Sequence, residues 1–292
     1  MKHSPVRSFA ALILLLPALV ALVSCAAPPA AQTGESADTR RLHALFDEAW
    51  EDNMRRHPEW ATYVGDKRYG DKLEDVSPAA EAEGFATKRR FLAAAQAVPR
   101  EALSVKDRSS RDIFIHQLQD DFRFEPLVGF RRLSLAAIGG FQNQLADLLN
   151  ASPLATKGDG EQMLLRLAAY PRRVDQELVN LRQGLALGWV PPPAVLDRVI
   201  EALDKQIAAS GDTNPFFQPF TRLGQGIALP DQEALRERAR SVIAGQVVPA
   251  QRRLRAFVAG EYRAGAPASG AMGSYPGGAA AYDAAVRSQT TT

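Results

Sequence analysis

Histidine is the residue type whose spacing in this 292-residue chain bears most directly on metal chemistry. A zinc hydrolase needs two or three imidazole or carboxylate ligands that converge on the metal, and a His-Glu-x-x-His helix supplies two of them one turn apart. The chain has His3, His43, His57 and His116; none is followed by Glu, and no two lie within one helical turn. We therefore expect the last three to be surface or helix-end residues, and we predict no metal ligand and no cofactor in this chain.

Nucleophilic and phosphate-binding motifs are also missing from the sequence. No Gly-x-Ser-x-Gly segment is present to form a nucleophile elbow, and Gly224-Gln-Gly226 lacks the third glycine of a dinucleotide site. Paired carboxylates can do general acid–base work only when they converge, whereas adjacent residues diverge on a helix. We interpret the following acidic pairs as solvated faces and predict no catalytic residue: Asp47/Glu48, Glu51/Asp52 and Asp120/Asp121.

The composition is that of a globular protein. Apolar residues make up 46% of the chain and charged residues 23%, which excludes wholesale disorder, while one cysteine excludes a disulfide scaffold. The formal charge of +2 argues against a nucleic-acid-binding surface. We therefore expect no nucleic-acid partner.

The first 24 residues have the three parts of an export signal. Lys2 and Arg7 precede an apolar run, Phe9–Val23, which is shorter than the roughly 20 residues that a permanent membrane helix needs. Small residues follow the run. Removing residues 1–24 leaves 33 basic and 33 acidic residues, so the remaining chain is formally neutral.

The segment Leu22-Val-Ser-Cys25 resembles the lipobox of bacterial lipoproteins. The resemblance implies cleavage before Cys25, a lipid on its thiol and a membrane anchor, while the alternative is a secretory signal with an incidental cysteine. Residues 25–38 contain no large apolar residue after Cys25 and are predicted to be a lipidated tether that precedes a helical domain over residues 39–292. Ala26 resembles the sorting residue of lipoproteins on the periplasmic face of a Gram-negative outer membrane.

The remaining sequence predicts an all-α fold, a multi-helix array of amphipathic helices. No segment alternates apolar and polar residues long enough to require a strand. Capping serines are expected at Ser77 and Ser104, and prolines are expected to close the first helix at Pro58, bend one at Pro171 and kink one at Pro249. The apolar periodicity indicates helices around Leu42–Trp50, Pro78–Val98, Ser104–Phe122 (with Ile113 facing inward), Phe141–Asn150, Glu161–Gly188, Pro191–Ala209, Asp231–Tyr262 and from Ala279 onward.

Two further segments are open to a binding or a structural interpretation. Phe216-Phe217-Gln-Pro-Phe220 is either an aromatic binding cluster or a loop packed into the core, and we favour the core. The Gly-rich stretch Gly265–Gly278 gives a backbone that can approach a ligand or another segment closely.

From Lys106 onward, and also at Trp60–Gly65, the order of features resembles the first half of a bacterial family known as domain of unknown function 885. The pieces that carry the resemblance are Asp107–Asp112, Gly139–Leu145, Leu167–Pro171, Gly184–Pro191, Val248–Leu254, Pro276–Gly278, Tyr282 and Thr290–Thr292.

The resemblance implies a helical protein similar to zinc-dependent peptidases, often exported as a lipoprotein. In such relatives a His-Glu motif and a second His follow the Pro-Gly-Gly segment, so zinc is implied for the full-length relatives and the ligands are expected to be missing here. We therefore expect either a truncated gene or a natural short form that lacks the zinc ligands and the peptidase activity. Pro276, Gly277, Gly278 and Tyr282 either border a substrate cleft in relatives or only turn the chain between two helices.

Two interpretations of the function follow. In the first, the chain is the N-terminal, cleft-wall half of a zinc-peptidase-like lipoprotein, inactive alone, whose partners are a peptide substrate and the missing C-terminal half. In the second, it is a non-catalytic envelope lipoprotein that binds a peptide or a protein partner.

Cys25→Ser tests the predicted anchor. Without the thiol no lipid can be attached, so we expect the variant to leave the membrane fraction, as measured by fractionation of the expressing cells. A membrane-bound Cys25→Ser protein would refute the lipidation.

Overall fold

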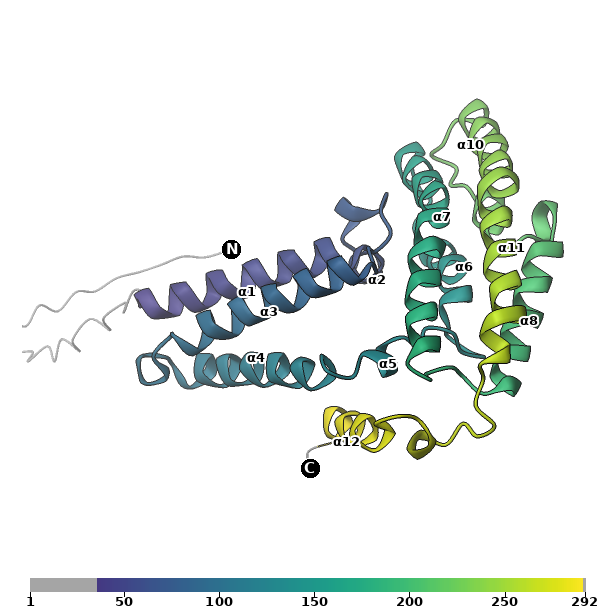
Figure 1. The fold of residues 1–292 in the computed structure, drawn as a ribbon. Helices are drawn as coiled ribbons and strands as arrows, with labels where there is room; N and C mark the ends of the chain where they lie inside the picture. Colours follow the sequence, from purple (N-terminus) through teal and green to yellow (C-terminus); the bar gives the residue numbers. More distant parts are fainter. Residues whose placement is uncertain (1–35, 291–292) are drawn as a thin grey trace, which may run out of the picture. The chain divides into compact units, whose positions relative to one another are not determined.

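The computed structural model describes residues 36–290, and these residues form helices without a β-strand (Figure 1). The predicted all-α class is therefore confirmed for the described part, whereas the predicted signal and Cys25 lie outside it. The α-helices are α1 (Ala37–Arg56), α2 (Pro58–Tyr63), α3 (Pro78–Gln96), α4 (Val105–Phe124), α5 (Val128–Arg131), α6 (Phe141–Ala151), α7 (Lys157–Ala186), α8 (Pro193–Ala208), α9 (Gln218–Thr221), α10 (Leu229–Val242), α11 (Val248–Phe257) and α12 (Gly278–Gln289). Short 3-10 turns are η1 (Lys67–Tyr69), η2 (Arg100–Ala102), η3 (Gly211–Thr213) and η6 (Met272–Ser274), and π-helical segments are η4 (Ile243–Val247) and η5 (Val258–Tyr262).

The N-terminal helices form a layer in which α3 packs against both α1 and α4. Their shared core contains Leu45, Phe91 and Leu118. The predicted caps are confirmed: the Ser77 side chain accepts a hydrogen bond from the Ala80 N–H, and that of Ser104 accepts one from the Asp107 N–H. These caps satisfy amide groups that the first helical turn leaves without partners.

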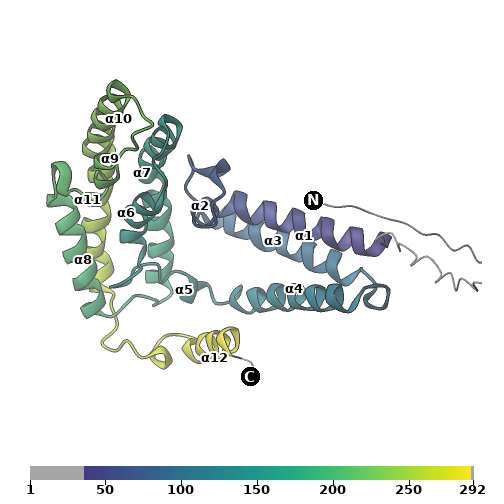
Figure 2. The ribbon, with the colours of Figure 1, turned by 180° about the vertical axis from the view of Figure 1, so that it is seen from behind.

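The second group of helices packs around α7, which contacts α10, η4 and α11, while α8 packs on α11 (Figure 2). Leu167, Val174 and Leu181 of α7 are fully buried there. The core interpretation of the aromatic loop is confirmed, because Phe216, Phe217 and Phe220 are at most 2% exposed.

The prolines act differently from one another. Pro171 lies inside α7, which continues on both sides of it, and Pro249 is the second residue of α11, directly after the π-helical η4. Proline lacks an N–H, and its ring crowds the carbonyl four residues earlier. The wider π-helical turn of η4, which ends two residues before Pro249, relieves this crowding. Pro58 closes α1 as predicted but also opens α2 at its first position, which the prediction missed.

Two residues predicted to face the core do not. Trp50 of α1 is 54% exposed and Ile113 of α4 is 58% exposed. The periodicity correctly predicts the helices, but Trp50 and Ile113 line an open cavity between α1, α3 and α4 instead of the core. The helical domain begins at Ala37, two residues before its predicted start, and α12 begins at Gly278, within one residue of prediction.

A buried arginine attaches α2 and the following segment to α7. Arg166 is 2% exposed, and its guanidinium donates to the carbonyls of Pro58 (3.0 Å), Lys72 (3.0 Å) and Tyr69 (3.3 Å) and to the Thr62 hydroxyl. These acceptors lie 94 to 108 residues away in sequence. This long-range contact therefore fixes the position of residues 58–72, which include α2 and η1, against α7.

No helix in residues 36–290 combines the length and the apolar character that a membrane crossing needs.

Candidate functional site

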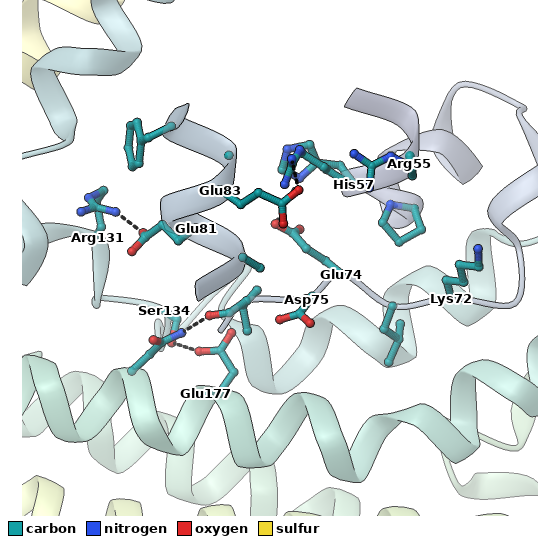
Figure 3. Close-up of a pocket in the computed structure, with 18 of the residues that line it drawn as sticks. Arg55, His57, Lys72, Glu74, Asp75, Glu81, Glu83, Arg131, Ser134 and Glu177 are labelled. Carbon is teal, nitrogen blue, oxygen red and sulfur yellow. Dashed lines mark hydrogen bonds and ion pairs between the residues drawn. The ribbon is translucent and has the colours of Figure 1, made fainter. Parts of the chain in front are cut away.

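A cavity of about 550 Å³ lies where α1 ends, α3 begins, and α5 and α7 approach them; we call it the charged cavity (Figure 3). Segment 72–76, which joins η1 to α3, forms one wall. The ionisable side chains that line it are Arg55, Arg56, His57, Lys72, Glu74, Asp75, Glu81, Glu83, Lys88, Arg131, Arg132 and Glu177.

Glu81 is the centre of the ion pairs on one side of the cavity. Arg132, which is 5% exposed, donates to both carboxylate oxygens of Glu81 (2.7 and 3.1 Å), and Arg131 donates to the same carboxylate. Figure 3 shows Glu81 and Arg131 directed toward each other. Burial opposes the ionisation of Glu81, but the hydrogen bond from Arg132 and the two positive charges outweigh it and hold the pKa of Glu81 below its usual range.

The floor of the cavity is a polar stripe on α7. Glu177 is 3% exposed, accepts from the Ser134 hydroxyl (2.8 Å) and pairs with Arg173 (3.0 Å). Asn180 follows one turn later and donates to the carbonyl of Val76 (2.8 Å). The stripe thus holds segment 72–76 in place while it lines the cavity.

Two buried atoms that belong to this lining have no hydrogen-bond partner among residues 36–290. One is the acceptor Asn180 Oδ1, on a side chain that is 6% exposed, and the other is the donor Arg131 Nε. Buried polar atoms are nearly always paired, with protein, water or ligand. Because both atoms are closed off from solvent, a ligand in the cavity could reach them only if the surrounding side chains moved.

The residues present do not form a zinc site. His57 is the one imidazole in the lining, and its Nδ1 is 3.1 Å from Glu74 Oε1. Nowhere in residues 36–290 do three His, Cys, Asp or Glu side chains converge in a way that could hold a metal ion. The arrangement is suited to binding charged or polar groups.

The predicted cleft-border residues lie away from the charged cavity. Pro276 accepts a hydrogen bond from the Trp189 indole N–H (3.1 Å), and a Cβ on Gly278 would lie 1.8 Å from the carbonyl oxygen of Met272. Gly277 has a φ of +72°, a conformation that favours glycine. These three residues therefore form a turn that packs on Trp189. Tyr282 lies on α12 and is 61% exposed. A role of the four residues at a substrate cleft remains a prediction.

The residues predicted from the sequence do not include four that line the cavity: Glu81, Arg132, Glu177 and Asn180. A signal was present in α7, where polar residues interrupt the buried face: Arg166, Arg173, Glu177 and Asn180. Long polar side chains at buried positions need partners, so such interruptions mark a polar contact or a site.

The fold and the cavity define the chain as a helical protein with a charged cavity. The family model described as "Bacterial protein of unknown function (DUF885)" matches residues 58–292. The chain therefore belongs to the DUF885 family, which confirms the family predicted from the sequence.

The fold also occurs in a solved structure. The crystal structure of "the putative lipoprotein from Colwellia psychrerythraea" is similar to this chain with a TM-score of 0.76 and 13% identity. The match covers 88% of this chain and 47% of that protein, so this chain spans about half the length of its structural relative. Comparison with the curated proteins found no match.

Glu81→Gln tests the ion pairs of the charged cavity. Removing the charge leaves Arg132 buried without its carboxylate, and we expect a loss of about 1–3 kcal/mol of unfolding free energy at pH 7 in urea titrations. Because the pKa of Glu81 is lower in the folded chain, its stabilisation is present above the ordinary value of 4.5 and is lost as the pH falls through the folded-state value. The difference between the wild type and the variant should therefore shrink below about pH 4.

Glu83→Gln is the matched control, since Glu83 lies on the same helix with a side chain 67% exposed. Its effect should stay within about 0.5 kcal/mol. Equal effects of the two variants, or a Glu81→Gln effect independent of pH, would contradict the assignment.

Proposed function

We propose that this chain is an exported lipoprotein whose helical domain is the N-terminal, cleft-wall half of a zinc-peptidase-like DUF885 domain, without peptidase activity of its own. The observation that supports the proposal most directly is the half-length match: the chain fits 47% of its structural relative, and the family model matches it from residue 58 onward. The lack of a convergent metal-ligand group in residues 36–290 is consistent with ligands contributed by another part of the domain in relatives.

The location in the cell follows from the same proposal. The lipobox at Cys25 and the description of the structural relative as a lipoprotein both support an anchor in the cell envelope. Ala26 favours the periplasmic face of the outer membrane, with the membrane as the partner of the lipid on Cys25.

A second candidate function is supported by the charged cavity itself. A non-catalytic envelope lipoprotein that binds peptides would offer its ligand the mixed cations and carboxylates of this lining. To bind side chains or chain ends of a peptide, these groups would exchange ion pairs that they now make with other residues, such as that of Glu81 with Arg132.

The two candidates are tested together with the purified chain, incubated with zinc and a fluorogenic protein substrate. We expect no zinc-dependent cleavage and no stoichiometric zinc in the metal content of the purified protein. Zinc-dependent cleavage that disappears in His57→Ala would contradict both candidates. A monodisperse, zinc-free chain would favour the second candidate, and aggregation through unpaired helix faces would favour the first.

A further inference from the structure

A second cavity, of about 650 Å³, lies on the other side of the His57–Glu74 pair, between α2, the end of α1, α6 and α7. It shares those two residues with the charged cavity but differs in character. Trp60 and Tyr63, one turn apart on α2, line it together with Asn53 of α1 and Gln144 of α6. We call it the aromatic cavity.

The two aromatic rings are unusually open to solvent. Trp60 is 51% exposed and Tyr63 is 55% exposed, and neither the indole N–H nor the phenol has a hydrogen-bond partner among residues 36–290. They are nevertheless rigidly supported, because Arg166 binds the Pro58 carbonyl and the Thr62 hydroxyl of the same short helix. A fixed aromatic surface gives contact area at low entropic cost.

The charged groups of this cavity already have partners. Both oxygens of the Glu59 carboxylate accept the Glu74 N–H (3.0 and 3.1 Å), and the same carboxylate lies 3.6 Å from Arg173. Glu74 in turn pairs with His57. A charged ligand would therefore have to compete with existing ion pairs.

The groups that remain for a ligand are neutral. The side-chain amides of Asn53 and Gln144 are exposed and have no hydrogen-bond partner among residues 36–290. Each amide offers both a donor and an acceptor, which suits hydroxyl groups that also do both. The indole and phenol add two further polar groups beside the aromatic faces.

We propose that the aromatic cavity is a binding site for an uncharged oligosaccharide. A pyranose ring has one face of C–H groups, which packs against the electron-rich face of an aromatic ring, and a rim of hydroxyls, which the free amides can bind. A purely apolar ligand would leave these amides unsatisfied, and the cavity volume lies in the range typical of small-ligand sites. This site is independent of the function proposed above.

The experiment is a calorimetric titration of the purified full chain, in a detergent without a sugar headgroup, with tri-N-acetylglucosamine, with cellotriose and with a neutral proline-rich peptide of similar size. We expect saturable binding of at least one trisaccharide and no binding of the peptide. Trp60→Ala should weaken the binding by about tenfold or more, since a stacking partner is lost.

Trp50→Ala is the matched control, because Trp50 is 54% exposed but does not line this cavity. Gln144→Ala is a second variant of an exposed residue, expected to weaken binding without affecting the fold, which thermal unfolding checks. Three results would overturn the proposal: no saturable sugar binding, binding of the peptide alone, or equal affinity in the wild type, Trp60→Ala and Gln144→Ala.

Discussion

The contact on which both cavities depend is the buried guanidinium of Arg166. Burial lowers the pKa of Arg166, and the negative charges of Glu59 and Asp71 oppose this effect without forming an ion pair with it. The guanidinium instead donates hydrogen bonds to backbone carbonyls and to the Thr62 hydroxyl of a segment distant in sequence. Because a buried charge is costly unless its donors are satisfied, this arrangement favours one position of residues 58–72. That segment carries Pro58 and Lys72 of the charged cavity and Trp60 and Tyr63 of the aromatic cavity.

Other polar side chains of α7 also bind segments that are distant in sequence. One face supplies Leu167, Val174 and Leu181 to the main core, while a polar stripe faces segment 72–76. Gln176 and Asn180 bond to residues 75 and 76, and Glu177 binds Ser134. The helix thus joins the core and the cavity floor in one rigid element, so a ligand in the charged cavity would meet side chains whose positions are fixed by packing.

The sequence predicted the parts of this structure that depend on local patterns. Apolar periodicity located the main helices, and Ser77 and Ser104 marked two of their starts, because a cap acts within four residues. It did not predict α2, the π-helical η4 or the exposure of Trp50, which depend on which faces meet other helices. The cavities were also missed, since Arg166 and the segment it binds are about a hundred residues apart. The family resemblance was recognised from the sequence, but its motifs did not include the cavity residues.

Hydrogen exchange of backbone amides tests most directly whether Arg166 positions the shared wall of the two cavities. The measurement compares Arg166→Met with the wild type and with Arg252→Met, a control at an exposed residue. We expect the amides of residues 61–72 in Arg166→Met to lose protection by about 2 kcal/mol or more, while those of α8, α10 and α11 keep theirs. Arg252→Met should leave both sets unchanged. Wild-type protection of residues 61–72 in Arg166→Met would show that Arg166 does not position this segment.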